Sequence, residues 1–203
     1  MTAIPLPRKR VLADYVPAVA GIPASVGALV RDLVLIAAGA TFVGLLAQWS
    51  IPLPGTPVPL TLGTFAVLLT GASLGGVRGL LSIGVYLVAG GLGVNWFAGH
   101  QDGWGGPTFG YVVGFVAAAA LVGWLAQRGG DRTVLKTAVT MVLGNLVIYA
   151  VGVPWLMNVT GMDFATALDK GVVPFLLGDG IKVLAAAGLF PAAWALVKRV
   201  ERD

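Results

Sequence analysis

Two residues of opposite charge, Asp179 and Lys182, lie inside the last long apolar stretch of the sequence. Charged side chains in a membrane span are costly unless they pair or face a hydrated or ligand-filled cavity. Their i, i+3 spacing places both on one helical face. At about 1.5 Å per residue from Val173, they lie roughly 9 and 14 Å along the helix. We therefore predict a ligand site here; the alternative is a self-neutralising pair that only holds helices together.

Four further polar or aromatic residues lie at the ends of apolar stretches that we expect to meet at the same rim. Asn95 and Trp96 follow the third stretch, and Thr108 and Tyr111 begin the fourth. Trp and Tyr at such positions more often belong to the aromatic belt at the membrane surface than to a ligand site. Their expected convergence on Asp179 favours a ligand-binding role.

Tyr86 and Asn145 are polar groups inside the third and fifth stretches. Each is equally consistent with an interhelical hydrogen bond and with a ligand contact. The sequence offers no catalytic nucleophile, and a metal site is not expected, because there is no cysteine and His100 is the single histidine.

A run of small residues recurs at intervals of three and four in the first apolar stretch. Its members are Ala37, Ala40, Gly44 and Ala47. Such a smooth helix face lets another backbone approach closely. Either a helix of the same chain or a separate membrane subunit can occupy this face.

The composition is that of a membrane protein. Of 203 residues, 57% are hydrophobic and only 11% are charged, against about 25% charged in ordinary soluble domains. The net charge of +4 does not indicate nucleic-acid binding, because the basic residues lie in short loops between apolar stretches rather than on one face. A lipid bilayer is the expected surrounding.

The apolar stretches predict an all-α, polytopic membrane protein with six transmembrane helices. We expect the helices over about 33–49, 60–74, 80–97, 108–127, 138–157 and 173–197. Residues 51–59 contain four prolines and cannot continue a helix. The expected organisation is a cytoplasmic N-terminal segment over 1–28 and a six-helix substrate-binding domain over 29–203.

The distribution of basic residues predicts that both termini are cytoplasmic. With the N-terminus inside, Lys170 is the one basic residue in an outer loop, and Lys182 lies within a span. The other eleven lie in inner segments: Arg8, Lys9, Arg10, Arg31, Arg78, Arg128, Arg132, Lys136, Lys198, Arg199 and Arg202. This asymmetry follows the positive-inside rule for a multi-pass protein of the cytoplasmic membrane.

Four segments carry a family resemblance. They are VPLTLGTFAVLLTGASLGGVRG (58–79), YLVAGGLGVNWFAG (86–99), GGPTFGYVVGF (105–115) and PFLLGDGIK (174–182). In this order they resemble the BioY family, the biotin-binding S component of energy-coupling factor (ECF) transporters. Gly63 stands where the family usually has Gln, and Asn95 where it usually has Pro.

The resemblance implies a high-affinity binder of biotin that is not an enzyme and needs no cofactor. It further implies that the helix face at Ala37, Ala40, Gly44 and Ala47 docks on a transmembrane coupling subunit driven by ATPase subunits. Asp179 would accept from a ureido N–H of biotin, and Lys182 would donate to the ureido oxygen. Trp96 and Tyr111 would pack on the apolar rings.

Three other functions stay open at this stage. The chain is also compatible with an S component for a different vitamin, or with a solitary biotin transporter that needs no energising module. A membrane-embedded enzyme with Asp179 as general base is disfavoured, because no second acid, metal cluster or nucleophile accompanies it.

Overall fold

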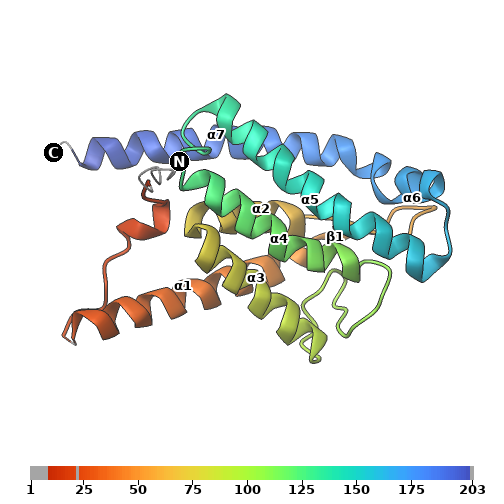
Figure 1. Cartoon of the computed structure of the whole chain (residues 1–203), viewed down its shortest axis with the longest axis horizontal. Coiled ribbons are helices and arrows are strands. Elements are labelled where there is room, and N and C mark those ends of the chain that lie inside the picture. The colour runs from red at the N-terminus through yellow and green to blue at the C-terminus, as the bar shows by residue number, and fades with distance from the viewer. Residues whose placement is uncertain (1–8, 22, 202–203) are drawn as a thin grey trace, which may run out of the picture.

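The computed structural model describes residues 9–21 and 23–201 of the chain. Two of the basic residues assigned to the inner side, Arg8 and Arg202, lie outside these ranges. The rest of the stretch 1–8 lies outside them as well. Within the described residues the fold is helical, apart from one pair of two-residue strands. Figure 1 shows that the helices run roughly along the long axis of the molecule, and that the described chain starts and ends toward the same end of this axis.

Six helices correspond to the six predicted spans. They are α1 (Ala24–Ala47), α2 (Gly63–Leu74), α3 (Gly76–Gly91), α4 (Phe109–Ala126), α5 (Val134–Thr160) and α7 (Leu176–Val200). The helices α1, α4 and α5, and the stretch Phe164–Val200, are long and apolar enough to cross a membrane. At about 1.5 Å per residue, α2 and α3 are too short to cross it as regular helices.

Several predicted boundaries were wrong. The helix α1 begins at Ala24, nine residues before the expected start, and so takes in the end of the segment 1–28. The polar loop expected after the fifth span contains a short helix, α6 (Phe164–Gly171). Asp163 caps it by accepting a hydrogen bond from the Thr166 backbone N–H at 3.0 Å. This hydrogen bond holds the pKa of Asp163 below its usual range. An amphipathic pattern of only about two helical turns is easily missed in an otherwise polar sequence.

The sixth span is not one continuous α-helix. A 3-10 turn, η2 (Val173–Phe175), carries Pro174 and precedes α7, which begins at Leu176. Asp179 therefore lies in the first turn of α7 rather than deep inside a helix. Because the N-terminus of a helix carries partial positive charge, the side-chain oxygens of Asp179 lie where the helix dipole attracts negative charge.

Short connections join the helices at both ends of the bundle. Between α1 and α2, strand β1 (Ser50–Ile51) pairs antiparallel with β2 (Leu60–Thr61). Between α2 and α3, Gly75 has φ 85° and ends one helix as it begins the next. Only glycine adopts this conformation readily, so a single residue suffices for the turn.

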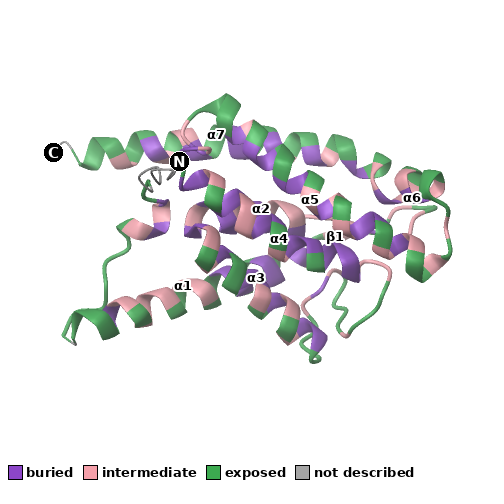
Figure 2. Ribbon diagram, in the orientation of Figure 1, coloured by how far each residue is buried: buried purple, intermediate pink, exposed green. Residues whose placement is uncertain are grey.

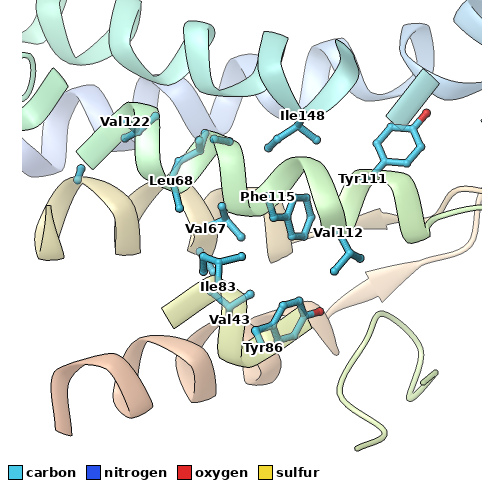
Figure 3. Packing of buried hydrophobic residues seen from close by; sticks show 14 of the residues in the cluster. Val43, Val67, Leu68, Ile83, Tyr86, Tyr111, Val112, Phe115, Val122 and Ile148 are labelled. Carbon is cyan, nitrogen blue, oxygen red and sulfur yellow. The ribbon is translucent and has the colours of Figure 1, made fainter. Parts of the chain in front are cut away.

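The core of the bundle surrounds α4. This helix packs against α2, α3 and α5, whereas α7 packs mainly against α5, and α1 against α2 and α3. Figure 2 shows buried residues along the inward faces of these helices and exposed residues on the outer faces of α1 and α7. Figure 3 shows the aliphatic side chains that fill the centre, with Tyr86 and Tyr111 toward the end that carries β1.

The N-terminal segment is packed against the bundle. The 3-10 turn η1 (Leu12–Tyr15) contacts α2, and Val11 and Ala13 are buried. Asp14 forms an ion pair with Arg78 at the start of α3. These contacts join the described part of the segment to the ends of α2 and α3 on the side of the chain termini.

Candidate functional site

A cavity lies at the end of the bundle opposite the chain termini. It encloses ≈ 640 Å³, including the open space at its mouth. Its walls come from β2 and the preceding loop, from the loop between α3 and α4, from the turn η2, and from α1, α2, α3, α4, α5 and α7. Five predicted site residues line it: Tyr86, Thr108, Tyr111, Asp179 and Lys182.

Asp179 and Lys182 form an ion pair at this cavity. The Lys182 Nζ atom lies 3.0 Å from Asp179 Oδ1 and also donates to Thr64 Oγ1 of α2 at 2.8 Å. The side chains are only 9% and 11% exposed, so the pair is almost removed from water. As expected from their i, i+3 spacing, the two side chains lie on the same face of the helix and contact each other.

Tyr149 of α5 completes the polar group. Its hydroxyl donates a hydrogen bond to Asp179 Oδ2, so each carboxylate oxygen has a donor. The ring of Tyr149 meets the ring of Tyr111 edge to face, with centroids 6.4 Å apart. Tyr111 itself donates to the Gly171 backbone oxygen at 3.0 Å, and this bond ties α4 to the segment that leads into α7.

The polar group retains hydrogen-bonding capacity. An ionised carboxylate offers about four acceptor positions and an ammonium group three donors. Asp179 accepts from Tyr149 and Lys182, and Lys182 donates to Asp179 and Thr64. A ligand that presents an N–H donor next to a carbonyl acceptor can therefore bind to both side chains at once.

Aromatic side chains form the opposite wall of the cavity. Tyr86 and Phe97 line it, with ring centroids 5.3 Å apart. Trp96 lies behind them and does not line the cavity: its indole N–H donates to the Tyr86 backbone oxygen at 2.9 Å. Trp96 was predicted to contact the ligand directly, but its ring packs against Gly44 of α1 instead of facing the cavity.

Two other predicted residues also lie away from the cavity lining. Asn95 is exposed, and its amide donates to the Asp102 side chain at 3.0 Å, within the loop between α3 and α4. Asn145 is buried in α5, one helical turn before Tyr149, and does not line the cavity. The spacing of four residues places both on similar faces of α5, but only Tyr149 reaches the polar group.

Sequence analysis did not identify Thr64 and Tyr149. Thr64 follows the position at which Gly63 departs from the family pattern, and Tyr149 is the one tyrosine of α5. Neither has a spacing that links it to Asp179, because the contacts form between separate helices. The position of Tyr149, one turn from Asn145, was the available signal.

The small-residue face of α1 is largely occupied by the chain itself. Ala40, Gly44 and Ala47 are buried, whereas Ala37 is exposed. A Cβ atom at Gly44 would lie 2.9 Å from the Trp96 ring. Three of the four small residues therefore serve close packing within the chain, which was the internal-helix alternative for this face.

The described residues contain no group of three or more His, Cys, Asp or Glu side chains that could hold a metal ion. The site's chemistry comes instead from one acid, one base and hydroxyl groups beside aromatic rings. Such a mixture is typical of a pocket that binds a small, partly apolar molecule.

Comparison with known sequences places the chain in a family. The profile of the BioY family matches residues 16–199. The chain belongs to the BioY family. It is therefore a multi-pass membrane protein of a transporter family, and not an enzyme.

Curated BioY relatives match over most of their own length. The probable biotin transporter BioY of Pyrococcus horikoshii is 39% identical over 158 residues, which cover 76% of this chain and 90% of that protein. The biotin transporter BioY of Rhizobium etli is 34% identical over 170 residues, with 77% and 89% covered. That of Thermotoga maritima is 36% identical over 140 residues, with 68% and 81% covered.

The fold also agrees with a solved structure. The crystal structure of the S-component for biotin from an ECF-type ABC transporter superposes with a TM-score of 0.72 and 23% sequence identity. The match covers 87% of this chain and 93% of that one. The predicted helical membrane fold of an S component is thus confirmed.

Proposed function

We propose that this BioY protein binds biotin in the cavity above Asp179 and Lys182 and serves as the substrate-binding component of an ECF-type transporter. One observation carries the proposal: a buried acid–base pair at a cavity keeps unused donor and acceptor positions. The names of its relatives, which are biotin transporters, point to the same ligand.

The chemistry of biotin matches these positions. Its ureido ring has two N–H donors and one carbonyl acceptor, so an N–H can donate to Asp179 while the ureido oxygen accepts from Lys182. Hydrogen bonds to charged partners are the stronger kind. Tyr149 and Thr64 hold the two side chains in place for this contact.

The apolar part of biotin has a matching wall. Its thioether ring and aliphatic chain can pack against Tyr111, Phe115 and Tyr86, which line the cavity. Trp96 supports this wall from behind through its bond to Tyr86. Thr108, at the mouth between the loop and α4, is available to the polar end of the ligand.

The proline-rich loop 51–59 is placed to act as a lid. Val58 and Pro59 line the cavity. Thr56 donates through its hydroxyl to the Lys170 backbone oxygen at 2.7 Å, which joins the loop to the end of α6. Opening of this contact would give the ligand access from the predicted outer side.

For transport, we propose that the chain docks on a transmembrane coupling subunit that works with ATPase subunits. Ala37 is the exposed member of the predicted docking face, and Ala38 and Thr41 beside it are also exposed small residues. We therefore place the partner contact on this side of α1, since small residues allow close helix approach.

Isothermal titration of the purified protein with biotin tests the binding function. We expect one site per chain, and competition by other water-soluble vitamins should be weak. Preferential binding of another vitamin would support an S component of different specificity. Biotin uptake by cells that lack ATPase subunits of ECF transporters would instead indicate a solitary transporter and contradict the proposed coupling.

A further inference from the structure

The two loops that line the cavity meet at one residue, Gln48, which caps the C-terminal end of α1. One loop follows it directly: the Ser50 backbone N–H donates to the Gln48 backbone oxygen at 2.8 Å as β1 begins. This loop continues through Val58 and Pro59, which line the cavity. The outer end of α1 thus sets where the first loop starts.

The second loop, residues 92–108, is held by the Gln48 side chain. The amide nitrogen donates to the Trp96 backbone oxygen at 2.7 Å and lies 3.3 Å from that of Phe97. The amide oxygen accepts from the His100 backbone N–H at 3.0 Å. Because backbone oxygens only accept and N–H groups only donate, the orientation of the amide is fixed by its partners.

The backbone that Gln48 holds is strained. His100 has φ 58°, the one positive φ outside glycine among the described residues. Left-handed conformations are unfavourable for residues with a side chain, and persist where surrounding contacts impose them. Here the contacts are the bond to Gln48 and the antiparallel bridge between Phe97 and Gln101.

The hydrogen bonds between Gln48 and loop 92–108 also position part of the cavity wall. Phe97 lines the cavity directly, and Trp96 supports Tyr86. The Trp96 ring rests on Gly44, one turn before Gln48 on α1. The side of the cavity formed by Phe97 and Tyr86 is therefore fixed to α1 by hydrogen bonds as well as by packing.

We propose that Gln48 is a positioning residue whose side chain fixes the cavity-lining loop 92–108 to the outer end of α1 and so limits how fast the ligand leaves. This inference rests on the proposed binding function. It also implies that a displacement of α1 moves both loops together. Gln48 does not line the cavity, so its effect on the ligand is exerted through Phe97 and the loop backbone.

The test substitutes Gln48→Met, which keeps a similar side-chain length and removes only the side-chain hydrogen bonds. The matched control is Gln101→Met, because the Gln101 side chain is exposed in the same loop and only its backbone pairs with Phe97. Dissociation of labelled biotin is measured after adding excess unlabelled biotin. We expect Gln48→Met to accelerate dissociation about tenfold or more, since at least two hydrogen bonds are lost. Gln101→Met should stay within about twofold of the unsubstituted protein.

The outcomes separate positioning from a general loss of structure. A purely structural role would reduce the fraction of protein that binds and leave the dissociation rate of the remaining fraction unchanged, which would overturn the proposal. Dissociation within about twofold of the unsubstituted protein would also overturn it.

A second measurement does not depend on the ligand. Hydrogen exchange of the ligand-free protein should become faster in 92–108 with Gln48→Met and not with Gln101→Met. Exchange in 50–62 should stay unchanged, because the bond from Ser50 to the Gln48 backbone oxygen survives the substitution. Unchanged exchange in 92–108 contradicts the proposal even if biotin does not bind. Failure of the unsubstituted protein to bind biotin, with the exchange result as expected, contradicts the proposed function instead.

Discussion

Asp179, in the first turn of α7, and Lys182, in the next turn, are each stabilised by contacts beyond their ion pair. Tyr149 donates to the carboxylate, Thr64 accepts from the ammonium group, and the helix N-terminus favours the negative charge. Removal of one member of a buried pair leaves an uncompensated charge, which costs far more than replacing both.

We expect Asp179→Asn to weaken biotin binding about 10–100-fold, because a hydrogen bond to a charged group is lost. Isothermal titration measures the affinity and thermal unfolding in detergent measures stability. Asp169→Asn is the matched control, since Asp169 is exposed on α6. Equal affinity in Asp179→Asn and the unsubstituted protein would remove Asp179 from the site.

The double variant Asp179→Asn with Lys182→Met separates binding from stability. Both charges are then absent, so the stability lost in Asp179→Asn should return in large part, while biotin affinity stays low. Recovery of affinity together with stability would mean that the pair only holds the bundle together. This is the structural alternative that the sequence left open.

At the scale of helices, glycines set the distance between α2 and α4. A Cβ atom at Gly71 would lie 2.6 Å from the Ala119 backbone oxygen, which no side-chain motion can relieve. We expect Gly71→Ala to lower stability by about 1–3 kcal/mol through overpacking. In a chain of this length that is roughly 2–4 °C in Tm per kcal/mol.

Gly84→Ala is the control for this substitution. No atom lies within 4 Å of a Cβ at Gly84 in α3, and alanine favours helix by about 1 kcal/mol. Thermal unfolding should therefore show no loss of stability for this variant. A Gly71→Ala protein as stable as Gly84→Ala would contradict the close contact between α2 and α4.

The connection between α4 and α5 is held by a buried acid, Asp131. It accepts a hydrogen bond from Trp194 of α7 at 2.7 Å, and Arg132 lies over the same indole ring. Burial raises the pKa of Asp131 above its usual 3.8, although the Trp194 bond and the charge of Arg132 offset part of the rise. The folded protein thus keeps this proton at pH values at which the unfolded chain has lost it.

Because the folded state binds more protons in that window, the free energy of unfolding falls as the pH rises from about 4 through the raised pKa of Asp131. We expect Asp131→Asn, whose amide oxygen can still accept from Trp194, to flatten this part of the curve. Thermal unfolding between pH 4 and pH 8 measures it, with Asp169→Asn as the control. An unchanged slope in Asp131→Asn would show that this carboxyl does not contribute.

The sequence predicts helices better than it predicts the contacts between them. The lengths of the apolar stretches predicted six helices, and the i, i+3 spacing of Asp179 and Lys182 predicted that the two side chains share a helix face. Both signals lie within a short segment of sequence. Tyr149 joins that pair from another helix, and Trp96 turns toward α1 rather than the cavity. Such arrangements depend on how helices pack, which a single spacing does not encode.

At the scale of the whole molecule, the cavity is lined by β2 and η2, and Figure 1 shows that α7 ends at the opposite end of the bundle. The basic residues of the connections follow the same division. Arg78 pairs with Asp14 and Arg132 donates to the Arg10 backbone oxygen, both in the N-terminal segment. The Lys170 backbone oxygen instead accepts from Thr56 in the loop that lines the cavity. With cytoplasmic termini, the cavity opens outward, as uptake of an external ligand requires.

Cysteine labelling tests this orientation, because the chain has no cysteine of its own. We expect Gly103→Cys, in the loop between α3 and α4, to react in intact cells with a membrane-impermeant maleimide. Thr133→Cys, at an exposed position in the connection between α4 and α5, should react only after the cells are opened. The excess of basic residues near Thr133 is expected to hold that connection on the cytoplasmic side. Labelling of Thr133→Cys but not of Gly103→Cys in intact cells would invert the topology and turn the cavity toward the cytoplasm.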